Sequence, residues 1–358
     1  MRELFLHVGL HKTGTSYLQR LFLENRDLLL AAGLGSGPWR HPVSGSHHPI
    51  LAALDREGPE AVFARAAGCP GDRLLISAEE LGSRLQEPGA AAALHAAASR
   101  HFDPHVVLFL RRQDVLKESV FAEIVKDWYA GDILGDHHYG YDHAGRVAAL
   151  EAVFGPDRVR VALYRDPGPN DIVGDLLAAT GTRLDPALLR AVAPQNVSMH
   201  RRKTLFLAAM PKPADATTVA SDRVAPRFVA RVVAGSDAIA DDGGRFLMSP
   251  RQRHDLVAAH QAGNRALVGR LGLADPGGFL DLPDPDAPWT PPAPITAREV
   301  TALWRECLAA CLRGRNPVAA ARLAAQVTRL LRPMSRRGGG DAAARAADRP
   351  AARRGLVG

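Results

Sequence analysis

The segment from Gly9 to Ser16 reads Gly-Leu-His-Lys-Thr-Gly-Thr-Ser and constrains the fold more than any other part of this 358-residue chain. An apolar run at 4–8 precedes it and predicts a buried strand, and apolar residues at helical spacing follow it over 15–30. A glycine-containing turn from a strand into a helix gathers backbone amides at the positive end of the helix dipole. We therefore expect an anion-binding loop at the edge of a sheet.

Further strands and helices alternate along the sequence. Apolar runs predict strands at 73–77, 106–110 and 158–163, and helical spacing predicts helices at 48–67, 114–129, 143–154 and 170–180. This alternation favours a three-layer α/β/α fold with a central parallel sheet, like that of P-loop NTPases. In such sheets ligands bind at the carboxyl ends of the strands, so the loops after the strands are expected to gather at one edge.

The remaining sequence predicts several additions to this fold. We expect an α/β domain over 1–275, a Pro-rich linker over 276–294, a helical hairpin over 295–332 and a disordered basic tail over 333–358. Within the first domain, Ser249 and Pro250 predict the start of a helix that reaches Leu271, and the Gly- and Pro-rich segment 33–45 predicts a loop.

Composition limits the classes of function only weakly. The formal net charge of +7 suits an anionic ligand, but part of it comes from arginines in the tail. Three cysteines make no disulfide framework or metal pattern, and we expect Cys307 and Cys311 to be small apolar residues on one helix face. No apolar run approaches the roughly 20 residues of a membrane span. We expect a cytoplasmic protein without a metal or a nucleic-acid partner; peripheral membrane contact and the oligomeric state stay open.

The loop differs from the Walker A motif in the position of its lysine. Walker A places Lys directly after the second Gly, whereas Lys12 precedes Gly14 by two residues. A strand followed by Lys-Thr-Gly-Thr-Ser, with Gly9 upstream, resembles the 5′-phosphosulfate-binding loop of PAPS-dependent sulfotransferases, which use 3′-phosphoadenosine 5′-phosphosulfate (PAPS) as donor. The resemblance implies that PAPS is the co-substrate and that it binds at Gly9, His11, Lys12, Thr13, Gly14, Thr15 and Ser16.

The same family carries a second phosphate site on a later strand. Its members place an Arg at the end of that strand and a Ser eight residues further on, both on the 3′-phosphate. Arg111 and Ser119 have this spacing, and an Arg fork can bind a phosphate through two hydrogen bonds. Many members read Arg-Asp-Pro where this chain reads Arg111-Arg112-Gln113, so Arg112 is an alternative to Arg111.

Sulfuryl transfer needs a base for the acceptor proton and a group that stabilises the leaving phosphate. The resemblance assigns Lys12 to the leaving group. Glu79 follows the strand at 73–77 and is our first candidate for the base, while Glu80 is expected to point away into solvent. His48 is the second candidate, because histidine has a suitable intrinsic pKa.

The resemblance covers 3–180 and continues more faintly to about 271, through Asn196-Val197-Ser198. Over this fainter part, Arg201, Arg202 and Lys203 are predicted to close over the 3′-phosphate or to form a solvated helix end. We expect a polar surface loop around His137, His138 and His143. The alternative is a loop that lines the acceptor site.

Two other classes of function remain open on the sequence. A P-loop kinase or other NTPase would hold Mg²⁺ with Ser16 and an acid at a strand end, where only Glu79 is available. A non-catalytic nucleotide-binding or scaffolding protein could use the C-terminal hairpin to bind a partner. For a sulfotransferase, the resemblance implies a hydroxyl or amine acceptor on a glycan, lipid or small metabolite, and a carbohydrate is our preference.

Overall fold

The computed structural model describes residues 1–127, 130–135, 140–165, 171–193, 199–211, 224–273, 278–313 and 317–337. The chain forms two compact units. The first unit comprises Met1–Leu116, Gly140–Val197 and His254–Pro283, and the second comprises Lys117–Tyr139, Ser198–Arg253 and Asp284–Gly358. This division does not test the domain boundaries expected from the sequence, which stay predictions.

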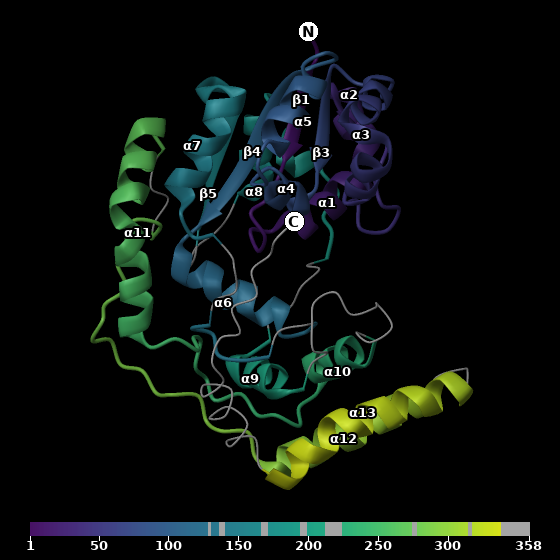
Figure 1. Ribbon diagram of the computed structural model, residues 1–358, viewed down its shortest axis with the longest axis vertical. Coiled ribbons are helices and arrows are strands. Elements are labelled where there is room, and N and C mark those ends of the chain that lie inside the picture. The colour runs from purple at the N-terminus through teal and green to yellow at the C-terminus, as the bar shows by residue number, and fades with distance from the viewer. Residues whose placement is uncertain are drawn as a thin grey trace. The chain divides into compact units, whose positions relative to one another are not determined.

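The first unit contains a five-stranded parallel sheet in the order β2-β3-β1-β4-β5. Figure 1 labels β1, β3, β4 and β5 of this sheet. Its strands are β1 (Glu3–His7), β2 (Leu34–Ser36), β3 (Arg73–Ser77), β4 (Asp103–Arg111) and β5 (Val159–Tyr164). The central strand β1 pairs with β3 and β4, and His7 at its end lies opposite Ser77 and Val107. The loops that follow β1 and β3 therefore leave the sheet at neighbouring positions.

Helices cover both faces of this sheet. On one face Phe5, Leu75, Val107 and Phe109 form a buried cluster with side chains of α1 (Thr15–Glu24), α2 (Arg26–Ala31) and α8 (Ile172–Ala179). On the other face α3 (Pro49–Ala67), α5 (Ala90–Ala98) and α7 (His143–Phe154) pack in a row, with α5 and α7 against β4. The predicted three-layer α/β/α fold with a parallel sheet is confirmed.

The other elements of the first unit are α4 (Glu79–Arg84), the 3₁₀ helices η1 (Pro156–Arg158) and η2 (Pro186–Leu188), and most of α11 (Pro250–Leu271). Side-chain contacts that hold α11 in this unit include a hydrogen bond between Asn264 and Gln113 and one from Arg270 to Glu151. Helix α6 (Gln113–Ile124) runs from the first unit into the second.

Two local features differ from the sequence prediction. The helix predicted over 15–30 is divided into two helices at Asn25. The Asn25 side chain donates to the carbonyl of Arg190 through Nδ2 and accepts from the amide of Arg190 through Oδ1. The segment 33–45, predicted as loop, contains the edge strand β2. A Cβ at Gly35 would lie 1.9 Å from the carbonyl oxygen of Pro70, so this strand needs the glycine that made it resemble a loop.

Among the described residues of the second unit, the regular secondary structure is helical, with irregular segments such as 236–249 and 284–296 between the helices. This unit contains α9 (Arg201–Ala209), α10 (Val224–Gly235), α12 (Ala297–Leu312) and α13 (Pro317–Arg337), so the predicted C-terminal helices are confirmed. A capping box between Thr296 and Glu299 starts α12, and Cys307 and Cys311 are free and buried on it, as expected. Helix α13 extends to Arg337, five residues into the segment for which the sequence predicts disorder.

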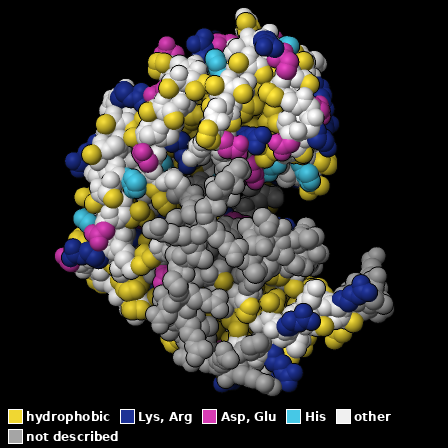
Figure 2. Space-filling view, viewed as in Figure 1, with side chains coloured by type: hydrophobic (Ala, Val, Ile, Leu, Met, Phe, Trp, Pro, Cys, Tyr) yellow, Lys and Arg dark blue, Asp and Glu magenta, His cyan; other side chains and the backbone are white. Residues whose placement is uncertain are grey.

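Basic side chains stand out along the α12–α13 hairpin in the space-filling view (Figure 2). Exposed arginines there include Arg305, Arg322 and Arg329. Over the described residues, no helix combines the length and the apolar composition that crossing a bilayer requires.

Candidate functional site

The loop after β1 stays paired with β4 before it turns into α1. The amide of Leu10 donates to the carbonyl of Phe109 (3.0 Å), and the amide of Phe109 donates to the carbonyl of Gly9 (2.7 Å). Gly14 ends the loop at φ 84°, and a Cβ there would lie 2.5 Å from Cδ1 of Ile172. The turn therefore has a defined place at the carboxyl edge of the sheet and requires glycine at position 14.

The N-terminus of α1 has the features of an anion site. Its first turn carries no acidic residue, and no side chain of the described residues caps it. The amide of Tyr17 donates to the carbonyl of Gly14 (3.0 Å), so the amides of Thr15 and Ser16 and the positive end of the dipole remain for an external anion. At Gly9 a Cβ would lie 3.1 Å from the amide nitrogen of His11, so the glycine leaves room beside that donor. The arrangement fits a phosphate or phosphosulfate group.

The residues of the loop differ in their exposure to solvent. Ser16 is exposed and Lys12 and Gly14 are half-buried, whereas Thr13 and Thr15 are buried. The hydroxyl of Thr13 donates to the carbonyl of Leu10 (2.7 Å) and so stabilises the loop itself. Sequence reasoning assigned this hydroxyl to the phosphate and did not anticipate its use inside the loop.

His11 and Glu79 form a pair that joins this loop to the segment after β3. Nδ1 of His11 lies 3.0 Å from Oε2 of Glu79. Burial acts to raise the pKa of Glu79, but the hydrogen bond and charge of His11 outweigh it and hold that pKa below its ordinary 4.5. Burial acts to lower the pKa of His11, but the Glu79 carboxylate outweighs it and raises that pKa above 6.5. The pair thus favours an ionised carboxylate beside an imidazolium.

Close backbone packing brings Glu79 to the loop. Glu79 is the first residue of α4, and a Cβ on Gly9 would lie 3.8 Å from the Glu79 Cα atom. At Gly82 a Cβ would lie 2.4 Å from the carbonyl oxygen of Val8. Glycine at these two positions lets α4 pack directly on the end of β1. Two regions that the sequence predicts separately, the loop and the candidate base, are therefore neighbours.

Arg111 and Arg112 have different surroundings. Nη1 of Arg111 donates to the carbonyl of Lys12 (2.7 Å), and its guanidinium lies 5.0 Å from the ring centroid of Tyr164. Arg112 is buried and makes a two-point ion pair with Asp114, at 2.7 and 3.1 Å. Because the Arg112 charge is committed to Asp114, Arg111 is the better candidate for a phosphate. Ser119 lies on α6 within the second unit, and its role stays a prediction.

His48 and Glu80 also form an ion pair, between Nε2 and Oε2. Both side chains are partly exposed, so Glu80 has a partner instead of standing alone in solvent. Its pKa is lowered, because the His48 hydrogen bond and charge outweigh the effect of burial. His48 is close enough for its charge to contribute to lowering the pKa of Glu79 as well.

A buried polar network under the loop escaped the sequence analysis. Nδ1 of His7 lies 2.9 Å from Oγ of Ser77, and Nε2 of Gln19 donates to the same oxygen (3.1 Å). Burial lowers the pKa of His7 to about 4, so this histidine is neutral at pH 7. The network joins β1, β3 and α1. In the sequence, this network is signalled only by one polar residue near the end of each of two apolar runs. These residues are His7 in the run at 4–8 and Ser77 in the run at 73–77.

The structure assigns His143 a role that the sequence did not indicate. Instead of lying in a polar surface loop it begins α7, is buried, and bonds through Nε2 with the carbonyl of Arg111 (2.8 Å). Burial lowers its pKa to about 4. The other two histidines of that predicted cluster, His137 and His138, and the Asn196-Val197-Ser198 segment lie outside the described residues.

The basic triplet at the start of α9 is buried inside the second unit. Arg201 pairs with Asp242 (2.8 Å), and Arg202 pairs with Glu299 (2.8 Å). Nζ of Lys203 donates to the carbonyl of Ala234 (3.2 Å). These partners give the triplet a structural role, in place of both the phosphate-closing loop and the solvated helix end that the sequence suggested. Within the described residues, no group of three or more His, Cys, Asp or Glu could hold a metal ion.

Comparison with known proteins adds one structural likeness. No protein-family model matches the chain, and no curated protein matches it. Among solved structures, the crystal structure of a sulfotransferase from Alicyclobacillus acidocaldarius is similar, with 17% sequence identity and a TM-score of 0.40. The match covers 76% of this chain and 97% of that one. Identity and score are both low, and the case for a function rests on the residues of the site.

Proposed function

We propose that this chain is a PAPS-dependent sulfotransferase that moves a sulfuryl group to a hydroxyl or amine of an acceptor, with a carbohydrate as the preferred class. One observation carries the proposal: the Arg111 guanidinium donates to the carbonyl of Lys12 at 2.7 Å. The strand end that carries Arg111, the proposed cation for a second phosphate, is thus hydrogen-bonded directly to the proposed anion-binding loop. A nucleotide with phosphates at its 5′ and 3′ positions needs two such groups close together.

Donor binding divides between the two groups. The amides of the loop and of the first turn of α1, with Lys12 and the hydroxyls of Thr15 and Ser16, would hold the 5′-phosphosulfate. Arg111 would hold the 3′-phosphate, which is the group that distinguishes PAPS from ATP. The participation of Ser119 stays an expectation from the sequence. The Arg111 guanidinium lies over the ring of Tyr164, a contact that limits the orientations it adopts.

The transfer itself needs a base and a stabilised leaving group. The acceptor oxygen or nitrogen attacks sulfur, the bond from sulfur to the bridging phosphate oxygen breaks, and adenosine 3′,5′-bisphosphate (PAP) leaves. Glu79 would take the acceptor proton, and Lys12 would stabilise the negative charge on the bridging oxygen. His11 would hold the Glu79 carboxylate in place. His48 is the second candidate for the base.

A transfer assay tests the proposal directly. The purified chain is incubated with radiolabelled PAPS and a panel of carbohydrate, lipid and small hydroxyl or amine acceptors, and PAP and labelled product are both measured. We expect PAP to form only with a suitable acceptor and its formation to be lost in Lys12→Ala. Phosphoryl transfer from Mg-ATP would instead indicate a P-loop kinase or NTPase. PAP binding without transfer across the panel would favour a non-catalytic protein.

A further inference from the structure

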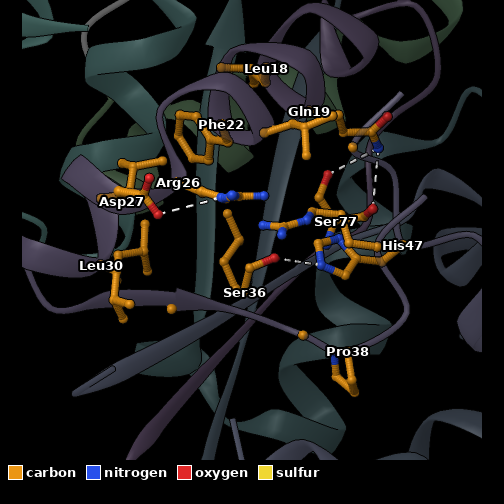
Figure 3. Close-up of a pocket in the computed structure, with 18 of the residues that line it drawn as sticks. Leu18, Gln19, Phe22, Arg26, Asp27, Leu30, Ser36, Pro38, His47 and Ser77 are labelled. Carbon is orange, nitrogen blue, oxygen red and sulfur yellow. Dashed lines mark hydrogen bonds and ion pairs between the residues drawn. The ribbon is translucent and has the colours of Figure 1, made fainter. Parts of the chain in front are cut away.

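A cavity of about 350 Å³ opens beside β2, against α1, α2 and the loop that follows β2. Its apolar wall includes Leu18, Phe22 and Leu30, and its polar wall includes Ser36, His47 and Ser77. Figure 3 shows Phe22 and Leu30 on the side of Arg26, with Ser36 and His47 facing them. The volume falls in the range of small-molecule sites, which combine apolar walls with a few placed polar groups.

The wall made by the loop after β2 is well fixed. The amide of His41 donates to the carbonyl of Ser46 (2.7 Å), and the amide of His47 donates to the carbonyl of Ser77 (2.8 Å). Arg20 on α1 donates to the carbonyl of Val43. At Gly45 a Cβ would lie 2.1 Å from the carbonyl oxygen of Gln19, so the loop packs directly on α1. The cavity is therefore a built feature of the first unit.

The cavity carries one net positive charge at neutral pH. Arg26, Arg40 and Asp27 line it, and arginines stay protonated in proteins. His47 is neutral, because burial lowers its pKa to about 4. Nε of Arg26 meets Oδ1 of Asp27 only at 3.4 Å, with both side chains exposed.

Arg40 is the group that points to a ligand. It is half-buried, and within the described residues it has no hydrogen bond or ion pair. Burial and the charge of Arg26 lower the pKa of Arg40, and together they outweigh the opposite effect of the Asp27 carboxylate. A guanidinium taken partly out of water without a hydrogen-bonded anion has a desolvation cost, and the exposed Asp27 carboxylate offsets it only in part.

We propose that this cavity binds a small organic monoanion with an apolar body. Its anionic group would lie between Arg40 and Arg26, and its body would pack on Leu18, Phe22 and Leu30. Such a ligand neutralises the net charge of the cavity and buries apolar surface on both sides. Binding of this monoanion does not depend on sulfuryl transfer. The experiment that tests it therefore measures ligand binding and not enzyme activity.

The test is isothermal titration calorimetry of the full-length chain with 4-phenylbutyrate and with its neutral amide, 4-phenylbutanamide. We expect the carboxylate to bind at least about tenfold more tightly than the amide, and Arg40→Gln to weaken carboxylate binding by about tenfold to a hundredfold, the usual loss for a hydrogen bond to a charged group. Arg40→Lys should retain most of the affinity. Arg56→Ala, which removes an exposed arginine of α3 outside the cavity, should leave it unchanged.

Circular dichroism and a thermal melt establish that each variant is folded. The proposal is overturned if 4-phenylbutyrate shows no saturable binding to the wild-type chain, or if the amide binds as tightly as the carboxylate. Equal affinity in Arg40→Gln and wild type would overturn it as well. The comparison of carboxylate and amide needs only the wild-type chain, so it stands even if a variant fails to fold.

Discussion

The imidazole of His11 lies 3.0 Å from the carboxylate of Glu79, and this contact joins the phosphate loop to the segment after β3. Each partner shifts the pKa of the other toward the charged form, against the effect of burial. A carboxylate placed in this way stays ionised and has a fixed orientation. It is therefore in the deprotonated form that the proposed general base requires, and its lowered pKa makes it a weaker base than an unpaired carboxylate.

The pair gives a pH-dependent stability. The folded pKa of His11 is raised, so its contribution is fully present below about pH 6.5 and is lost as the pH rises through the folded pKa. The folded pKa of Glu79 is lowered, so its contribution is present above about pH 4.5 and is lost as the pH falls through the folded pKa. Both contributions are present between these values.

Urea unfolding of wild type and Glu79→Gln checks this expectation. The difference in their free energies of unfolding should be larger at about pH 5.5 than at about pH 9. In an NMR titration, the pKa of His11 should also fall when Glu79 is replaced. An equal difference at both pH values, with an unchanged His11 titration, would contradict the ion pair.

The candidate base can be tested against its alternative. Glu79→Gln keeps the size of the side chain but removes the proton acceptor, and general-base catalysis typically contributes about 10²- to 10⁴-fold. We expect kcat to fall within that range while the affinity for PAP stays within about twofold of wild type. His48→Gln is the matched control and should retain most of the activity. The opposite pattern would assign the base to His48.

Arg112 should matter for stability and not for donor binding. Its removal would leave Asp114, whose side chain has no exposed surface, without its two-point ion pair. Breaking a buried pair typically costs about 3–5 kcal/mol, so Arg112→Ala should lower the free energy of unfolding by about that amount. Arg56→Ala, at an exposed site, should change it by less than about 0.5 kcal/mol. Similar stability of the two variants in chemical denaturation would contradict the pairing.

Gly14 and Gly89 offer a matched pair for the geometry of the phosphate loop. Each is a helix N-cap with positive φ, at 84° and 74° respectively. A Cβ at Gly14 would lie 2.5 Å from Cδ1 of Ile172, whereas a Cβ at Gly89 meets nothing within 4 Å. Both alanine variants incur roughly 1–2 kcal/mol for the left-handed conformation, and Gly14→Ala should lose more because of the contact. Equal losses in thermal or urea unfolding would show that the contact with Ile172 is unimportant.

The sequence predicted the layers of the fold because strands and helices of clear periodicity alternate. The strand at 73–77 and the helix at 143–154 coincide with β3 and α7. It did not predict β2, because a three-residue edge strand around Gly35 has no periodicity to detect. The sequence also predicted one continuous helix through Asn25. The break there accompanies a hydrogen bond to Arg190, which is far along the chain and which local spacing does not reveal.

The candidate site shows the same division. The loop at 9–16 and Glu79 could be found because they follow recognisable strands. The pairing of His11 with Glu79 and of Arg112 with Asp114 depends on side-chain directions at the sheet edge, which spacing does not determine. The burial of Arg201, Arg202 and Lys203 depends on partners up to about a hundred residues away, so a local basic run suggested a ligand-facing loop instead.

The central claim is that Lys12 and Arg111 hold the two phosphates of one nucleotide. Calorimetry with PAP and with AMP, in buffer containing EDTA, tests it most directly. The account predicts that PAP binds without metal and at least about tenfold more tightly than AMP, that Arg111→Ala removes this preference, and that Lys12→Ala weakens both ligands. Equal affinities of the wild-type chain for PAP and AMP, or binding of ATP only with Mg²⁺, would contradict it.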